Sequence, residues 1–225
     1  MICLVTDSRR LAAPGAAFSA RRVCLMAQAR HAIDAGVDLI QLREPDLEAA
    51  DLAVVAADLR KLTRGTATRL VINDRIDVAL VSGADGVHLR GDSIPIARAR
   101  QLGPSGFLIG RSVHAAEEAT AAAGADYLVA GTVFSSASKP GKTRLLGISG
   151  LRDVVAAARM PVLAIGGIAG ERIDAVAAAG AAGFAAIELF MASHHDAEVD
   201  GCRAVELRQT VKDARSRFDR PGTTP

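Results

Sequence analysis

The stretch AGADYLVA, residues 123–130, recurs in altered form at three other places: AGVDLIQL from residue 35, SGADGVHL from residue 82 and AGAAGFAAI from residue 179. In each copy an alanine-rich, helix-like segment ends at a glycine, and a short apolar run follows within one to three residues. A glycine in the left-handed conformation ends a helix at little steric cost, and a continuous apolar run is typical of a strand buried in a parallel sheet. The pattern therefore predicts a helix, a tight turn and a buried strand at four places.

The spacing of these copies indicates how many units the fold contains. Their glycines are residues 36, 83, 124 and 180, so successive copies lie 47, 41 and 56 residues apart. One strand–helix–strand unit takes about 30 residues or more, which leaves room for two strand–helix units in each interval. Four further apolar runs supply the intervening strands: ICLVT, RLVI, FLIG and PVLAI, which end at residues 6, 72, 110 and 165.

Helical patterns fill the gaps between these strands. We expect helices over residues 22–35, 47–64, 75–82, 95–102, 115–123, 149–158, 171–179 and 199–215. A doubly wound open sheet would also alternate strands and helices, but its dinucleotide-binding fingerprint, G-x-G-x-x-G, is absent. Eight units in roughly 200–250 residues instead favour an α/β fold with a single (β/α)8 barrel, a TIM barrel. We expect this domain to cover residues 1–218 and residues 219–225 to form a disordered tail.

Composition restricts the partners and the compartment. The 225 residues carry a net charge of +2 and are 3% aromatic, so no basic face with stacking rings is indicated for nucleic acid. The three cysteines are far apart and form no C-x-x-C pair, as in a reduced, cytoplasmic protein. No signal-peptide pattern opens the chain, and its most apolar run, residues 176–187, is shorter than the roughly 20 residues that a membrane span needs. The sequence leaves a homo-oligomer open.

Polar side chains follow almost every predicted strand. In such barrels the chemistry takes place at the carboxyl ends of the strands, so these side chains would share one mouth. The cations Arg43, Arg111 and Lys139, with nearby hydroxyl groups, indicate an anion site, because phosphate oxygens accept hydrogen bonds from charged donors and backbone N–H groups. The pair Gly166–Gly167 follows the seventh strand, where barrels often bind phosphate through bare backbone.

Two carboxylates lie among these cations. Asp74 and Asp92 suggest Mg²⁺, which proteins commonly hold with one or two carboxylates plus substrate phosphates. Simpler interpretations stay open for some of these residues: Asn73 or Asp74 could cap the helix that follows, and the glycine pair could be only a tight turn.

Histidines and one glutamate have less specific interpretations. His88 within the apolar GVHL run favours a hydrogen-bonded core histidine, and His114 a residue at a helix start that could touch substrate. The segment His194–His195–Asp196 has a metal-like composition, but it lies beyond the last strand and we do not expect zinc there. Glu188 ends a buried strand, so its carboxylate needs a partner.

Six of these segments occur in a recognisable order: QLRE, INDR, DGVHL, IGRSVH, ADYLVAGTVFSSASKPG and PVLAIGGI. The set resembles the thiamine phosphate synthase/TenI superfamily over roughly residues 2–190. For the synthases, the resemblance implies a step of thiamine biosynthesis in which hydroxymethylpyrimidine pyrophosphate and thiazole phosphate condense to thiamine phosphate and pyrophosphate. It implies Mg²⁺ as cofactor and a dissociative mechanism, in which pyrophosphate leaves before the thiazole nitrogen attacks.

The resemblance also implies roles for individual residues. Carried over by motif, the pyrophosphate would be held by Gln41, Arg43, Asn73 and Lys139, with Ser112 beside it. The thiazole phosphate would be held by Ser136, Ser138 and the Gly166–Gly167 backbone. On this basis we expect Arg43, Lys139 and Ser112 to be catalytic and Asp74 and Asp92 to bind metal. The residues expected to bind substrate are Gln41, Asn73, Ser136, Ser138, Gly166, Gly167 and His114.

The chain also departs from the superfamily's patterns. Synthases usually have a lysine at the position of Pro45, a second metal aspartate at that of Ser93, and a serine-containing turn where this chain has IELFMAS. The thiazole tautomerases of the superfamily use a histidine at the position of Thr132. Three functions therefore stay open: thiamine phosphate synthase, a transferase; TenI-like thiazole tautomerase, an isomerase; and a non-catalytic barrel that binds a phosphate ligand and regulates the pathway.

Overall fold

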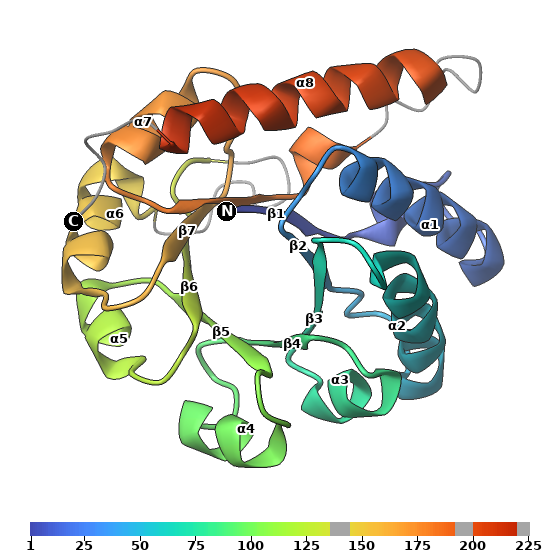
Figure 1. The fold of residues 1–225 in the computed structure, drawn as a ribbon, viewed down its shortest axis with the longest axis horizontal. Helices are drawn as coiled ribbons and strands as arrows, with labels where there is room; N and C mark the ends of the chain where they lie inside the picture. The colour runs from blue at the N-terminus through green and yellow to red at the C-terminus, as the bar shows by residue number, and fades with distance from the viewer. Residues whose placement is uncertain (136–144, 192–199, 220–225) are drawn as a thin grey trace.

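The computed structural model describes residues 1–135, 145–191 and 200–219, which form a ring of eight parallel strands surrounded by helices (Figure 1). Each strand pairs with the next one along the chain, and β8 pairs with β1, so the sheet is closed. The (β/α)8 barrel predicted from the repeated pattern is confirmed. The predicted tail falls largely outside the described residues.

The elements alternate strictly. The strands are β1 Ile2–Val5, β2 Leu39–Leu42, β3 Arg69–Asn73, β4 Gly86–Leu89, β5 Leu108–Val113, β6 Tyr127–Gly131, β7 Val162–Ile165 and β8 Gly183–Ala186. The helices are α1 Phe18–Asp34, α2 Ala49–Thr63, α3 Ile76–Ser82, α4 Ile96–Leu102, α5 Ala116–Ala121, α6 Gly147–Ala157, α7 Arg172–Ala178 and α8 Asp200–Phe218. Two 3-10 turns, η1 Ser8–Arg10 and η2 Glu188–Phe190, follow β1 and β8.

The four repeated glycines adopt the conformation that the pattern requires. Gly36, Gly83, Gly124 and Gly180 have φ angles of 84°, 65°, 92° and 84°, in the left-handed region that side chains disfavour. Each one turns the chain out of a helix and toward the next strand. The repeat is therefore a structural one, built on the turns between helix and strand.

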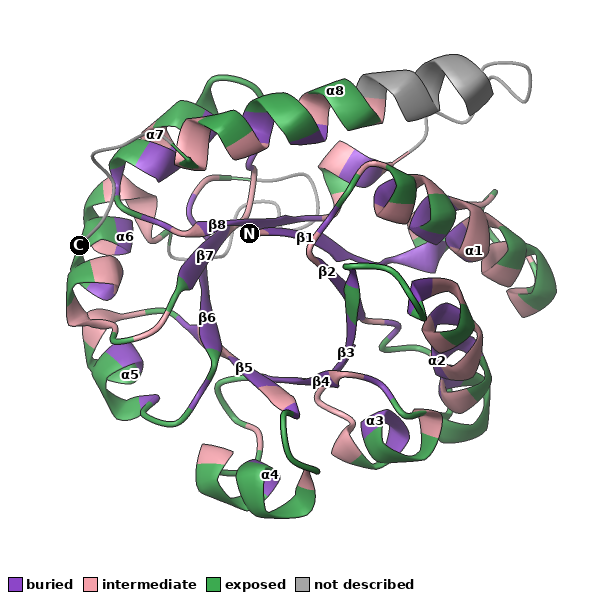
Figure 2. Ribbon diagram, viewed as in Figure 1, coloured by how far each residue is buried: buried purple, intermediate pink, exposed green. Residues whose placement is uncertain are grey.

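The core has two layers, because every strand is covered on both faces. Inside the barrel a small cluster packs the strands together: Cys3, Val5, Leu39, Val71, Tyr127, Val129, Leu163 and Ala185. A larger cluster lies between the strands and the inward faces of the helices, and Figure 2 shows these faces buried and the outward faces exposed. The inner layer fills the barrel below the carboxyl ends of the strands, so a cavity has room only above it.

Several boundaries differ from those predicted by one to four residues, and two of these differences have a clear reason or consequence. Helix α1 begins at Phe18, four residues before the predicted start, because the Phe18 ring packs against the core cluster. Strand β5 continues to Val113, three residues beyond its predicted end at residue 110. The second difference matters for the site, because successive side chains of a strand point to opposite faces.

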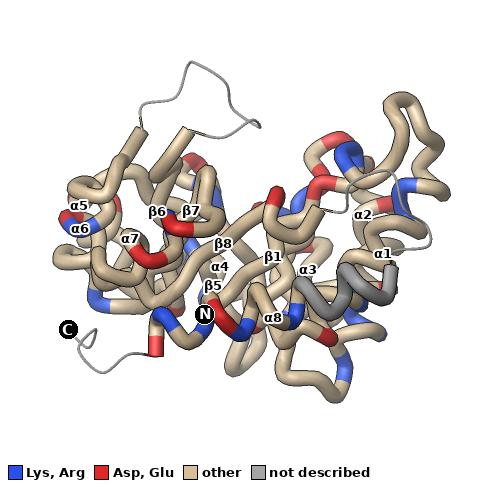
Figure 3. Tube along the Cα trace, turned by 90° about the horizontal axis from the view of Figure 1, so that it is seen from above, with Lys and Arg blue, Asp and Glu red and all other residues tan. Residues whose placement is uncertain are grey.

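In Figure 3 lysines and arginines are interspersed with aspartates and glutamates along the described chain. None of the described helices has the length and apolar character needed to cross a membrane. Cys3 and Cys24 are free thiols, and Cys3 is buried inside the barrel.

Candidate active site

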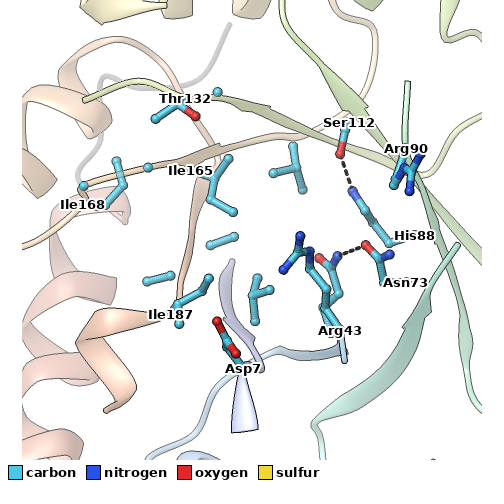
Figure 4. A pocket seen from close by; sticks show the side chains of 18 of the residues that line it. Asp7, Arg43, Asn73, His88, Arg90, Ser112, Thr132, Ile165, Ile168 and Ile187 are labelled. Atoms are coloured by element: carbon cyan, nitrogen blue, oxygen red, sulfur yellow. Dashed lines mark hydrogen bonds between the residues drawn. The ribbon is translucent and has the colours of Figure 1, made fainter. Parts of the chain in front are cut away.

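A cavity of about 620 Å³ opens above the inner core layer, at the carboxyl ends of the strands. Its two sides differ in chemistry. Figure 4 shows Arg43, Asn73, His88, Arg90 and Ser112 on one side and the side chains of Ile165, Ile168 and Ile187 on the other. Eight of the predicted site residues line it: Gln41, Arg43, Asn73, Asp92, Ser112, His114, Gly166 and Gly167. The cavity can therefore receive a ligand that is anionic at one end and apolar at the other.

Arg43 is the cation that the fold presents most directly to the cavity. It follows β2, and its backbone N–H donates to Thr6 Oγ1 at 2.9 Å, which ties the end of β2 to that of β1. Its guanidinium extends into the cavity in Figure 4, and within the described chain no carboxylate lies in ion-pair distance of it. An arginine without a protein counter-charge is suited to bind a phosphate oxygen through paired N–H donors.

The amides of Gln41 and Asn73 line the cavity beside Arg43. The Gln41 Nε2 group donates to Asn73 Oδ1 at 2.9 Å, so each amide is oriented by the other. Among the described residues the amino group of Asn73 has no acceptor, so it can donate to a ligand.

A buried carboxylate, that of Glu44, stabilises the loop end beside Arg43. Both oxygens of Glu44 accept from the Ser8 N–H at 3.0 Å, and the Ser8 hydroxyl donates to one of them at 2.6 Å. Burial raises the pKa of Glu44, and hydrogen bonds from Ser8 act in the opposite direction. The contact holds η1, which carries Arg9, against the end of β2. Glu44 was not predicted; the signal for it was a charged residue directly after a buried strand.

Asp74 has an unusual backbone conformation at the end of β3. Its φ of 64° lies in the left-handed region, which few non-glycine residues adopt and which aspartate tolerates better than most. Its N–H donates to the His88 carbonyl at 2.8 Å, and its carboxylate accepts a hydrogen bond from the Ser93 hydroxyl. The sharp turn directs the carboxylate toward the loop after β4, where Arg90 Nη1 lies 3.8 Å from Asp74 Oδ2. Asp74, unlike Asn73 and Asp92, is not among the residues that line the cavity.

Asp92 pairs with an arginine. Arg90 donates from Nε and Nη2 to the two Asp92 oxygens at 2.9 and 2.5 Å, and this contact lowers the pKa of Asp92. Among the described residues no three histidine, cysteine, aspartate or glutamate side chains gather closely enough to hold a metal by themselves. The metal-binding roles of Asp74 and Asp92 stay predictions.

His88 lies at the floor of the cavity and is buried. Its Nε2 lies 2.9 Å from Ser112 Oγ, and its Nδ1 lies 3.3 Å from the Tyr127 hydroxyl inside the barrel. Burial lowers the pKa of His88 to about 3, and the nearby charge of Arg111 acts in the same direction. The prediction of a hydrogen-bonded core histidine is confirmed. The neutral ring positions the Ser112 hydroxyl at the cavity surface.

The low pKa of His88 makes a testable prediction about stability. A histidine whose pKa is lower in the folded state stabilises the fold above its unfolded pKa of roughly 6.5, and that contribution is lost as the pH falls toward 3. Imidazole ¹⁵N NMR spectra should therefore show His88 neutral at pH 5. His88→Asn, which cannot titrate, should lose less stability in urea between pH 7 and pH 4.5 than the wild type. A His88 that titrates near pH 6.5 in the folded protein would contradict the assignment.

The loop after β7 begins with two glycines, and both their backbone conformation and their close contacts exclude a side chain. Gly166 and Gly167 have φ angles of 103° and 62°. A Cβ on Gly166 would lie 2.3 Å from Thr132 Cγ2, and one on Gly167 would lie 2.4 Å from the Ser135 carbonyl oxygen. Within the described chain the Gly167 N–H has no acceptor. This backbone can approach a ligand closely and donate to an anion.

His114 lies near the same part of the cavity. Its Nδ1 is 2.5 Å from the Gly131 carbonyl oxygen, and its backbone N–H donates to Glu118 at 2.8 Å, just before α5 begins. Glu188, which needed a partner, accepts from Arg10 Nη2 at 3.2 Å and is half-exposed.

One predicted anion ligand lies elsewhere. Because β5 continues to Val113, Arg111 and Ser112 point to opposite faces, and only Ser112 lines the cavity. Arg111 donates to the carbonyls of Gly91 and Ile94 at 2.6 and 3.2 Å. The prediction that Arg111 belongs to the anion site was therefore wrong. Its side chain instead holds the loop after β4.

Several predicted residues fall outside the described chain: Ser136, Ser138, Lys139 and the segment His194–His195–Asp196. Conversely, the cavity is lined by two arginines to which the sequence assigned no role, Arg9 and Arg90. Both lie within a few residues of a strand end and two residues from an aspartate that pairs with them, Asp7 and Asp92. That spacing was the available signal.

The closed barrel and its mouth, with Arg43 and the amide pair on one side and isoleucines on the other, place the chain among (β/α)8 proteins with a polar ligand site at the strand ends. Comparison with known proteins makes this specific. The family model described as thiamine monophosphate synthase matches residues 12–190, and the chain belongs to that family.

Named relatives agree with this assignment. The thiamine-phosphate synthase of Methanoregula boonei is 45% identical over 161 residues, which cover 71% of this chain and 74% of the relative. That of Pyrococcus horikoshii is 38% identical over 191 residues, covering 84% and 89%. The solved structure of thiamine phosphate pyrophosphorylase from Pyrococcus furiosus superposes with a TM-score of 0.75 at 34% identity and covers 95% of this chain and 96% of its own.

Proposed function

We propose that this chain is a thiamine phosphate synthase, a transferase of thiamine biosynthesis. It joins hydroxymethylpyrimidine pyrophosphate to thiazole phosphate and releases thiamine phosphate and pyrophosphate. The relatives that carry this name match most of the chain at 38–45% identity. The observation in the site that carries the proposal is the Arg43 guanidinium, which has no ion-pair partner in the described chain and lines the cavity together with the Gln41–Asn73 amide pair.

The polar side of the cavity suits the leaving group. When the bond between the pyrimidine methyl carbon and the pyrophosphate oxygen breaks, its electron pair and the growing negative charge remain on the pyrophosphate. Arg43 and Asn73 can donate hydrogen bonds to that charge from positions that the barrel holds before the reaction, so they stabilise the transition state more than the ground state. We assign Lys139 to the same task and Ser112, oriented by His88, to a hydrogen bond beside it.

The apolar side suits the other product of that step. Loss of pyrophosphate leaves a pyrimidine-methyl cation, which the thiazole nitrogen must capture before water does. Ile165, Ile168 and Ile187 line this side of the cavity and reduce the access of water. By the resemblance, the thiazole phosphate would accept from the Gly167 N–H and from the hydroxyls of Ser136 and Ser138, the last two outside the described residues.

Mg²⁺ is the cofactor that we propose for this reaction. The fit rests on Asp74, whose hard carboxylate oxygens lie at a strand end beside the loop that carries Arg90. Mg²⁺ prefers such oxygens and is commonly completed by substrate phosphates. When bound, it would offset the charge of the pyrophosphate. Asp92 is the second carboxylate that we propose near this ion, and it keeps its ion pair with Arg90.

The alternative functions have less support in the site. Thr132 lines the cavity at the position where the superfamily's tautomerases use a histidine, and a threonine hydroxyl is a poor group for moving a proton at neutral pH.

Soluble substrates also agree with the cytoplasmic location that we propose.

One assay tests the proposal. Incubation of the protein with hydroxymethylpyrimidine pyrophosphate, thiazole phosphate and Mg²⁺ should yield thiamine phosphate, and EDTA should stop its formation. Asp74→Ala should lower kcat/KM by about 10²-fold or more, as expected for removal of a group that stabilises developing charge. The matched control is Asp77→Ala, three residues further on, whose carboxylate is 63% exposed and pairs with Arg75.

Each outcome of this assay is informative. Product that forms undiminished in EDTA and in Asp74→Ala would refute the metal role. If no product forms, the thiazole carboxylate phosphate tautomer should be supplied next. Its isomerisation would favour the tautomerase, and binding without conversion would favour the regulatory barrel.

A further inference from the structure

Arg90 follows β4 and lines the cavity, yet neither the sequence nor the proposed mechanism gives it a task. A guanidinium carries five N–H donors in a fixed plane. Asp92 accepts from the edge formed by Nε and Nη2. Three N–H groups, two on Nη1 and one on Nη2, have no acceptor among the described residues, because Asp74 lies beyond hydrogen-bond distance at 3.8 Å. The second edge of the fork is therefore available to a ligand.

The loop that carries Arg90 is held at several points. The Arg90 N–H donates to Ser93 Oγ at 2.7 Å, and the Ser93 N–H donates back to the Arg90 carbonyl at 3.1 Å. Arg111 donates to two further carbonyls of the loop, those of Gly91 and Ile94. The guanidinium itself is fixed by Asp92. Binding of an oxyanion would thus cost little of the side-chain entropy that a free arginine loses.

Two carboxylates face Arg90: Asp92 pairs with it, and Asp74 Oδ2 lies 3.8 Å from its Nη1. Its partner Asp92 is 70% exposed, so water screens that ion pair strongly. On the cavity side, the neighbouring lining groups are the neutral His88 and Ser112, and Figure 4 shows these three side chains close together. A second cation, Arg43, extends into the same cavity.

We infer that Arg90 is a further substrate-binding residue, which binds the pyrophosphate group through its Nη1–Nη2 edge, with Asp92 as the residue that positions it. The inference rests on the proposed function for the identity of the anion. It gives this chain a pyrophosphate cation after β4, in addition to Arg43 after β2, whereas Pro45 supplies none. In this arrangement Asp92 acts through Arg90 while the cavity binds pyrophosphate.

The test measures binding of inorganic pyrophosphate by titration calorimetry, in EDTA and in Mg²⁺, so that no turnover is needed. Arg90→Gln should weaken binding about tenfold or more, as expected for loss of charge-assisted hydrogen bonds. Arg90→Lys keeps the positive charge but loses the paired N–H donors of the guanidinium. Its affinity for pyrophosphate should therefore lie between those of wild type and Arg90→Gln. The control is Arg75→Gln, because Arg75 pairs with Asp77 through the same two nitrogens but lies outside the cavity lining.

Equal affinities for pyrophosphate in wild type and Arg90→Gln, or an equal loss in Arg75→Gln, would overturn the inference. So would a wild type that does not bind pyrophosphate. Thermal melting of each variant shows that it is folded, which we expect because the Arg90 side chain is half-exposed. A wild type that binds pyrophosphate through Arg90 but makes no thiamine phosphate would support this inference and refute the proposed function, so the two failures are distinguishable.

Discussion

Replacement of Arg43 by glutamine is expected to lower kcat/KM for thiamine phosphate formation by about 10²–10³-fold, the range observed when one preorganised donor to a developing negative charge is removed. Arg43 has no counter-charge in the described chain, so its positive charge is fully available to the leaving pyrophosphate. Stability should change little, since the side chain makes no ion pair. Steady-state kinetics with each substrate varied in turn would measure the effect.

The control for this variant is Arg69→Gln. Arg69 begins the neighbouring strand β3 at the opposite end of the barrel, where it is exposed. Its replacement should leave kcat/KM within about twofold of wild type, because a distant exposed charge is largely screened by salt. If Arg43→Gln retained wild-type turnover, Arg43 would not contact the leaving group and the polar side of the cavity would need another role.

Among the substitutions proposed here, Gly110→Ala should lower the free energy of unfolding the most. Gly110 lies inside β5, and a Cβ there would lie 2.2 Å from Tyr127 Cζ and 2.5 Å from His88 Nδ1. Both rings are buried and hydrogen-bonded to each other, so neither can move without breaking that contact or displacing the inner core. Overpacking of a core typically costs about 1–3 kcal/mol, and we expect at least the upper end here. Urea unfolding monitored by circular dichroism would measure it.

Gly91→Ala is the matched control for this substitution. A Cβ on Gly91 would meet no atom within 4 Å, so the free energy of unfolding should stay within about 0.5 kcal/mol of wild type. The Gly110→Ala protein, if it folds at low temperature, should also lose activity, because displaced His88 no longer orients Ser112. Unchanged stability in Gly110→Ala would mean that the barrel interior has space that the structure does not show.

Arg43→Gln and Gly110→Ala act on different layers of the barrel. The inner core, with Tyr127 and His88, fills the barrel and forms the floor of the cavity. Arg43 lies at the end of β2, above that floor. Activity therefore depends on groups at the rim, whereas stability depends on the packing below it, as the barrel fold generally allows.

Local rules were enough to predict the barrel. Glycines at helix ends adopt positive φ because of their own lack of a side chain, and apolar runs form strands wherever both faces are covered. The order of the strands in the sheet then follows from parallel connections between neighbours. For the same reason eight predicted site residues line one cavity: each followed a strand, and all parallel strands end at the same face.

Contacts between distant loops could not be obtained in this way. Arg111 was assigned to the anion site because β5 was expected to end at residue 110, and the three extra residues turned its side chain to the other face. Glu44 contacts Ser8, 36 residues away, and Arg90, after β4, approaches Asp74, after the neighbouring strand β3. No spacing in the chain encodes such distances. They depend on loop paths and side-chain packing in the folded barrel, so the location of the site follows from sequence, whereas its pairs of interacting charges arise only in three dimensions.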